Sequence, residues 1–166
     1  MPRANEPIAV NTGPILALDA CGQLDLLKSL HSRVLIPEAV GTELRRGRGP
    51  GSRLSVPTQQ PAWLEVRALR APLSPLLIEY LDPGEAAAIA LALEQGIPIV
   101  AIDERRGRMV ARAFGLQVTG SIGVLLRAKR EGLLPAVKPC IASMRERGVW
   151  LGQRIAREAL REAGEE

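Results

Sequence analysis

The chain alternates between short apolar runs and longer segments in which apolar residues recur every three or four positions. Short runs of this kind are typical of buried strands, and the longer pattern is typical of amphipathic helices. The runs predict strands at 7–10, 33–36, 97–102 and 116–118, and alternation at 63–69 predicts an edge strand. Because strands alternate with helices, we expect a three-layer α/β/α sandwich with a mainly parallel sheet.

The middle of the chain carries the clearest signals for individual elements. Asp82 and Glu85 stand three residues apart, as in a capping box, so a helix is expected to begin here. Residues 86–93 include no polar side chain, which predicts a helix buried on nearly all sides, and Gly96 ends it. Asp103 follows the next strand, and sites in parallel α/β sheets lie at the carboxyl ends of strands.

The rest of the chain is expected to form further helices around one glycine- and proline-rich loop at 47–61. Ser121 is expected to cap one of these helices. At 166 residues the chain fits a single domain spanning 1–166, with a core at about 7–134 and C-terminal helices at about 135–164. The further helices are predicted at 15–21, 23–31, from 37 onward, 74–81, 121–131, 135–147 and 153–163.

Composition and charge narrow the class of partner. The net charge of +4 favours anionic partners, nucleic acid first. Basic residues are concentrated at 43–53, 104–112 and 127–147, although a solvated helix face explains any single arginine equally simply. Aromatic residues make up only 2% of the chain, which argues against proteins that stack successive bases on aromatic platforms.

Few residues are suited to sulfur or imidazole chemistry. His31 is the single histidine, so histidine-based catalysis and a zinc cluster are not expected. Cys21 and Cys140 fit no metal-binding spacing and are expected to be buried thiols in a reducing cytoplasm. The N-terminal residues contain no long apolar run, so we expect neither a signal peptide nor a membrane span.

Four oxygen-bearing side chains stand at comparable places in the predicted sheet. Asn11 and Asp103 each end a strand, Glu43 lies in the helix after the second strand, and Glu85 lies in the first turn of the apolar helix. In a parallel sheet these places converge on one edge, where we expect the carboxylates of Glu85 and Asp103 to be exposed. Clustered carboxylates favour a hard cation such as Mg²⁺ or Mn²⁺, which lowers the pKa of a bound water and stabilises charge on a phosphate.

Each of these residues also has a simpler interpretation. Glu85 serves a capping box with Asp82, and Asp103 serves as a cap for the helix that follows it. Glu43 alone reads as a solvated surface acid, and Asn11 alone as a turn or cap residue. The site hypothesis therefore depends on the joint arrangement of the four.

Four segments of the chain, taken together and in order, resemble a PIN domain. They look closest to the subfamily described as predicted nucleic-acid-binding proteins containing a PIN domain, and the resemblance covers roughly 8–134. The segments are VNTGPILAL, IPEAVGTEL, LDPGEAAAIALAL and AIDERRGRMVARAFGLQVTGSIGVLL.

The resemblance implies a metal-dependent ribonuclease fold, common in VapC-type toxins of toxin–antitoxin pairs. The acidic motif of the family maps onto Asn11, Glu43, Glu85 and Asp103 as ligands of Mg²⁺ or Mn²⁺, with the three acids as the catalytic set. Thr12 matches a hydroxyl position often found in the site. The implied partner is RNA, and a homodimer and a small antitoxin protein are consistent with the family. The candidate substrate-binding residues are Thr12, Arg45, Arg105, Arg106 and Arg108.

Asn11 is one departure from the family pattern, because most PIN nucleases carry Asp there. An amide oxygen can ligate Mg²⁺ but brings no negative charge, which leaves a second interpretation open. This is a catalytically weak or inactive PIN fold that serves as an RNA-binding or protein-interaction module. A third interpretation, a nucleotide-binding or receiver-like α/β domain, lacks the glycine-rich phosphate-binding fingerprint.

Overall fold

The computed structural model describes residues 5–46 and 60–166, and in it five strands form one parallel sheet. Most of the predicted loop at 47–61 lies outside the described residues. The strand order is β3-β2-β1-β4-β5, so β1 is central and both β3 and β5 are edge strands. The predicted parallel sheet is thereby confirmed. The strands are β1 (Ile8–Val10), β2 (Val34–Pro37), β3 (Leu64–Arg67), β4 (Ile99–Ala101) and β5 (Gln117–Thr119).

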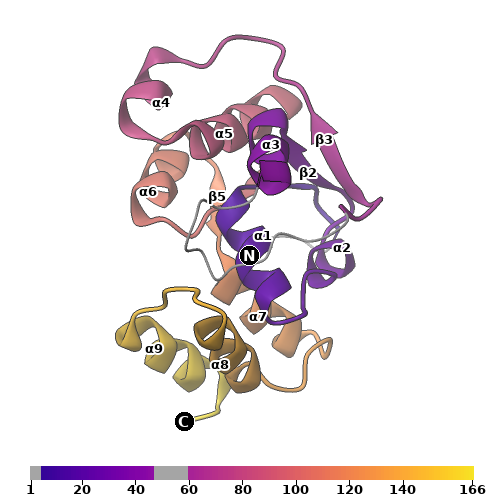
Figure 1. Cartoon of the computed structure of the whole chain (residues 1–166), viewed down its shortest axis with the longest axis vertical. Helices are drawn as coiled ribbons and strands as arrows, with labels where there is room; N and C mark the ends of the chain where they lie inside the picture. Colours follow the sequence, from indigo (N-terminus) through magenta and orange to yellow (C-terminus); the bar gives the residue numbers. More distant parts are fainter. Residues whose placement is uncertain (1–4, 47–59) are drawn as a thin grey trace.

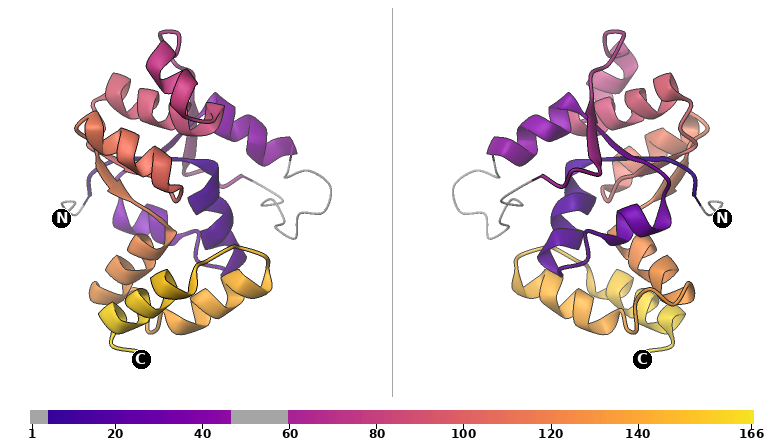
Figure 2. Two further views of the ribbon diagram at one scale, coloured as in Figure 1. Left: turned by 90° about the vertical axis from the view of Figure 1, so that its left-hand side faces the viewer. Right: turned by 90° about the vertical axis from the view of Figure 1, so that its right-hand side faces the viewer.

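Helices cover both faces of this sheet, so the predicted three-layer architecture is also confirmed (Figure 1, Figure 2). One face carries α1, α2 and α7, and the other carries α4, α5 and α6. Helices α8 and α9 pack outside α1 and α7, at the end of the molecule away from α4. The helices are α1 (Thr12–Ala20), α2 (Leu26–Leu30), α3 (Glu38–Arg46), α4 (Pro75–Tyr80), α5 (Pro83–Gln95), α6 (Arg105–Ala113), α7 (Ser121–Arg130), α8 (Lys138–Glu146) and α9 (Gln153–Ala163).

The short strands supply both hydrophobic cores because their side chains alternate between the two faces. In β1, Ile8 and Val10 point into the core under α1, α2 and α7, while Ala9 points into the core under α5. All three side chains are fully buried, as expected for a parallel sheet covered on both sides. Because both faces of the sheet are covered by helices, every residue of such a strand must be apolar.

Helix α5 is the most buried helix of the second face. Its residues from Gly84 to Ala92 are buried except for the half-buried Ala90, as the apolar run predicted. The helix begins with the capping box of Asp82 and Glu85 and ends at Gly96, whose φ of 63° is the left-handed conformation that favours glycine. The first turn of α5 therefore lies beside Asn11, at the carboxyl end of β1, and the other end of the helix leads into β4.

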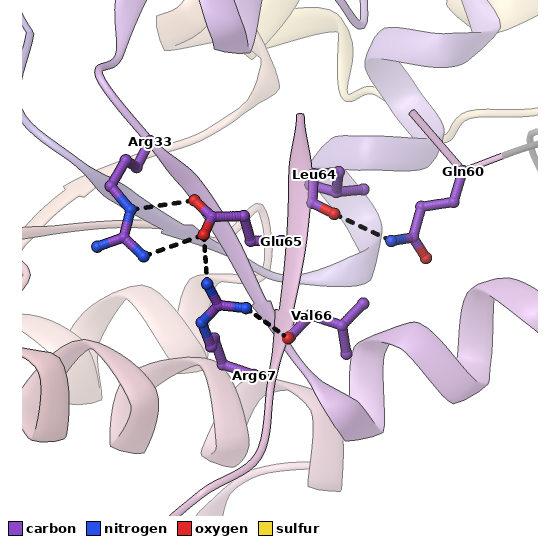
Figure 3. A network of polar contacts seen from close by, with 6 residues as sticks. All are labelled: Arg33, Gln60, Leu64, Glu65, Val66 and Arg67. Carbon is purple, nitrogen blue, oxygen red and sulfur yellow. Dashed lines mark hydrogen bonds and ion pairs between the residues drawn. The ribbon is translucent and has the colours of Figure 1, made fainter. Parts of the chain in front are cut away.

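The outer strand β3 is attached to β2 by side chains as well as by its backbone (Figure 3). Glu65 accepts two hydrogen bonds of 3.0 Å from the Arg33 guanidinium and also pairs with Arg67. Gln60 donates to the Leu64 carbonyl oxygen at 2.9 Å, which anchors the chain just before the strand. Charged side chains of this kind also discourage pairing of an open edge with another chain.

Among the described residues, no helix combines the length and the apolar character needed to cross a membrane.

Candidate functional site

Asn11 and Thr12 lie at the turn between β1 and α1. Asn11 stands at the N-cap position of α1, yet its side chain makes no capping hydrogen bond. Its backbone N–H donates to the Ala101 carbonyl oxygen at 3.0 Å, which holds the turn against the end of β4. Asn11 and Thr12 are each 6% exposed, so their polar groups are buried without being used for the helix.

Glu43 reaches this turn from α3. Thr12 donates its hydroxyl hydrogen to Glu43 Oε2 at 2.8 Å. The other oxygen, Oε1, lies over Gly84 in the first turn of α5, because a Cβ atom on Gly84 would stand only 2.5 Å from it. The same Cβ would stand 3.1 Å from Asn11 Oδ1. Two side-chain oxygens, one from the residue after β1 and one from α3, therefore border one small space that only a glycine leaves open.

Glu85 is buried, at 5% exposure, so the expectation that it is exposed at the sheet edge is wrong. The reason is that α6 packs over it, with Gly107 so close that a Cβ there would lie 3.1 Å from Glu85 Oε1. Glu85 Oε2 accepts from the Asp82 N–H at 3.3 Å, so the capping box does form. Burial raises the pKa of the Glu85 carboxyl, and the nearby charge of Asp82 raises it further.

Asp103 lies two residues beyond β4, and its carboxylate turns toward the start of α7. It accepts from the Ser121 N–H at 2.7 Å and from the Ser121 hydroxyl at 3.0 and 3.2 Å. Asp103 does not cap the helix that follows it, because the N-cap of α6 is Glu104 and that side chain makes no cap hydrogen bond. The expected capping role of Ser121 is also wrong, since its hydroxyl serves Asp103 and the N-cap of α7 is Gly120.

The surroundings of Asp103 disfavour the charged form of its carboxyl group. Although the residue has an exposed side, protein atoms surround its carboxylate and raise its pKa, against the opposing effect of the Ser121 hydrogen bonds. Arg108 lies nearby, half-buried, and donates to the Ile102 carbonyl oxygen at 3.0 Å. A Cβ on Gly120 would meet Asp103 Oδ1 at 2.6 Å and Arg108 Nη1 at 2.8 Å, so both groups border this glycine.

The structure brings the predicted residues to one edge of the sheet without closing them into a tight cluster. Asn11 and Asp103 follow the adjacent strands β1 and β4, and a Cβ on Gly13 would contact the Asp103 carboxylate at 3.9 Å. Within 5–46 and 60–166, no three Asp, Glu, His or Cys side chains are near enough to hold a metal ion. The side chains that face this edge carry carboxylate, amide and hydroxyl oxygens, which are the metal-binding atoms that suit Mg²⁺ and Mn²⁺.

The predicted cationic residues divide into two kinds. Arg45, Arg105 and Arg106 are exposed on α3 and at the start of α6, where they are open to a ligand. Arg108 is instead held inward against Ile102. Arg46 is also exposed at the end of α3, whereas Arg48 and Arg53 of the basic segment 43–53 lie outside the described residues.

The sequence analysis missed the glycines that make room for the site. Gly84, Gly107 and Gly120 each stand where a Cβ would lie within about 3 Å of a candidate side chain or its neighbour. Their signal was present, because each stands inside one of the segments that carry the family resemblance. Ser121 was recognised only as a helix cap, since its contact with Asp103 depends on β5 lying beside β4.

Comparison with known proteins adds one finding. A family model described as a PIN domain matches residues 7–165, nearly the whole chain. No curated protein and no solved structure gave a significant match.

Proposed function

The chain belongs to the PIN-domain family, whose members are generally nucleases, and we propose that it is a metal-dependent endoribonuclease that hydrolyses RNA phosphodiesters. One observation supports this most strongly. Asn11 and Glu43 direct oxygens into the space above Gly84, and Asp103 follows the neighbouring strand. Three elements that are distant in sequence thus present oxygen donors at the carboxyl edge of one parallel sheet, where ligands of α/β proteins bind.

Asn11, Glu43, Glu85 and Asp103 would hold Mg²⁺ or Mn²⁺. Such an ion supplies a water of lowered pKa and compensates the charge that develops on the phosphate. The raised pKa values of Glu85 and Asp103 fit this role, because burial raises both pKa values by more than the nearby charges of Arg106 and Arg108 lower them. An ion at this edge would offset the burial that now disfavours their charge.

The protein's own groups hold the ligands in place. Thr12 and Ser121 each donate a hydrogen bond that orients a candidate ligand, Glu43 and Asp103 respectively. Such outer contacts orient metal-binding carboxylates and raise metal affinity. Arg105 and Arg106, exposed beside Asp103 at the start of α6, would bind the RNA backbone.

A second candidate function rests on Asn11. An amide in place of a carboxylate reduces the charge at the site by one unit, which favours a PIN fold that binds RNA or a protein without cleaving RNA. A toxin role, a homodimer and a small antitoxin partner rest on the family resemblance alone. A small open reading frame beside the gene, and copurification of its product, would support the toxin role.

The proposed function is tested by incubating labelled single-stranded RNA with the protein and with Mg²⁺ or Mn²⁺. We expect cleavage with either ion and none after chelation by EDTA. The Asp103→Asn variant, prepared in parallel, separates this activity from a contaminating nuclease. Full cleavage after thorough chelation contradicts the metal mechanism. RNA binding without cleavage under any metal condition supports the non-catalytic alternative.

A further inference from the structure

Among the residues that the structure describes, Trp150 is the most exposed large apolar side chain, at 86% of its surface. It stands in the turn between α8 and α9, where its neighbours Val149 and Leu151 are half-buried against the core. Tryptophan usually packs its large ring and leaves only one edge wet, because burying the ring is strongly favourable. A tryptophan held almost wholly in solvent by anchored neighbours needs an explanation beyond folding.

Exposed arginines flank this tryptophan in the sequence. The segment 145–157 contains four arginines against one acid, Glu146. All four arginines are exposed, and Arg145 donates to the Leu151 carbonyl oxygen at 3.3 Å, which holds its guanidinium beside the turn. Arg154 pairs with Glu158, but both side chains are largely open to water, so this pair is weak and easily exchanged for another anion. The arginines are Arg145, Arg147, Arg154 and Arg157.

The α8–α9 turn lies on the side of the C-terminal helices that faces the candidate site. Figures 1 and 2 show the α8–α9 turn on the side of the C-terminal helices that faces α6 and the sheet. Arg105 and Arg106 are exposed at the start of α6, next to Asp103. A strand of RNA engaged at the carboxyl edge therefore has a second cationic surface on the C-terminal helices to continue toward.

We propose that the α8–α9 turn is an RNA-binding element, in which one unpaired base stacks on the Trp150 indole while Arg147 and Arg154 contact the flanking phosphates. Every base has a π face, so stacking on an exposed indole requires no particular sequence. Arginine adds attraction to phosphate and stacks on aromatic rings. The low aromatic content is consistent with a single stacking position rather than a platform for successive bases. This inference rests on the proposed function only in taking RNA as the ligand.

Fluorescence gives the most direct test. The Trp63→Phe variant leaves Trp150 as the one tryptophan, so its emission reports on the turn alone. We expect single-stranded oligouridylate to quench this emission in EDTA, where cleavage does not occur. Inorganic polyphosphate should bind the same surface without the same quenching, because it carries charge but no base.

Affinity measurements on the otherwise wild-type chain give a second test that does not depend on Trp63→Phe folding well. We expect Trp150→Ala to weaken binding of labelled oligouridylate about tenfold, equivalent to about 1.4 kcal/mol, and Trp150→Phe to weaken it less. Binding of polyphosphate should change little in Trp150→Ala. The control is Ile78→Ala, which removes a side chain that is 59% exposed on α4, far from these arginines, and should leave RNA affinity unchanged.

Three results overturn the proposal: unchanged RNA affinity in Trp150→Ala with no quenching, absence of RNA binding by the wild-type chain in EDTA, or loss of self-association in Trp150→Ala with RNA affinity intact. The last result would make Trp150 a contact between copies of the chain. Asp103→Asn distinguishes this proposal from the proposed function. That variant should lose cleavage yet retain RNA binding and the quenching of Trp150.

Discussion

Two acids of this molecule, Asp103 and Glu165, have opposite electrostatic settings. Glu165, just after α9, accepts from the Lys129 ammonium at 2.8 Å and from the N–H groups of Val137 and Lys138 at 2.7 and 2.8 Å. These donors, the Lys129 hydrogen bond first, lower the pKa of Glu165 to about 2. Within the described residues, only Ser121 donates hydrogen bonds to Asp103, and the surrounding protein raises the pKa of Asp103.

The difference separates an acid that serves the fold from one that is available to a ligand. Glu165 joins the end of α9 to α7 and to the start of α8. Its negative charge is therefore compensated by donors within the protein itself. Asp103 and Glu85 retain charges that the protein disfavours, at the edge where ligands are expected. We therefore expect substitutions at the two places to separate activity from stability.

The largest expected effect is the loss of cleavage in Asp103→Asn. Asparagine keeps the shape and can still bond to Ser121, so the fold should persist and the melting temperature should stay level or rise. Cleavage should fall by about a hundredfold or more, the size seen when one preorganised electrostatic group is lost from an active site. The measurements are the cleavage rate and a thermal melt. Undiminished cleavage in Asp103→Asn would remove it from the catalytic set.

The next effect concerns the space above Gly84. A methyl group there would stand 2.5 Å from Glu43 Oε1, so Gly84→Ala should displace Glu43 and lower cleavage by about ten- to a hundredfold. Alanine favours a helix by up to about 1 kcal/mol over glycine. The free energy of unfolding should therefore fall much less than the loss of cleavage alone would suggest. Gly41→Ala in α3 is the matched control, because its Cβ would meet Val66 at an ordinary 3.5 Å. Equal cleavage in the two variants would show that the space is not part of the site.

Glu165→Gln should behave in the opposite way. Cleavage should be unchanged, and the free energy of unfolding should fall by about 1–2 kcal/mol at neutral pH. The effect is kept this small because nearby water screens the charge of Glu165. Because its pKa is lowered in the fold, Glu165 stabilises the protein above its unfolded pKa. That stability is lost as pH falls from about 4.5 toward about 2. Urea unfolding across this pH range measures this loss of stability.

The neighbouring Glu166→Gln is the control, because Glu166 forms an exposed ion pair with Arg161. It should change the free energy of unfolding by less than about 0.5 kcal/mol.

The smallest expected effect is electrostatic. Changing Arg105 and Arg106 together to Ala should weaken binding of all RNA sequences alike and reduce the slope of log affinity against log salt by about two. The measurement is RNA binding in EDTA over a range of salt concentrations. An unchanged slope would place the path of the RNA elsewhere, for example along the basic run 127–147.

Much of the architecture could be predicted because it follows from local patterns. The fully apolar strands and the unbroken apolar run of α5 require cover on both faces, which only a sandwiched parallel sheet supplies. That Asn11 and Asp103 lie at one edge of the sheet followed from the same reasoning, since both end strands of one parallel sheet, but that β1 and β4 are neighbours is known only from the structure. These inferences need no knowledge of how distant side chains meet.

Contacts between distant segments could not be predicted in this way. The burial of Glu85 depends on Gly107 letting α6 approach, and the partner of Ser121 depends on β5 lying beside β4. Glu165 sits in an ordinary charged C-terminal sequence, and nothing local indicates that Lys129 will meet it. Trp150 is an apolar residue in an apolar context, so its pattern predicts burial rather than exposure.

The proposed nuclease activity depends most on whether the oxygens at the carboxyl edge of the sheet hold a divalent ion. Calorimetric titration of Mn²⁺ into the wild-type chain and into Asn11→Asp tests this directly. A carboxylate at position 11 adds a full charge toward the ion, so Asn11→Asp should bind Mn²⁺ more tightly. The added charge should also destabilise the metal-free protein, because it joins Glu43, Glu85 and Asp103. Equal Mn²⁺ affinity in the two proteins, or no binding by either, would contradict the proposed site.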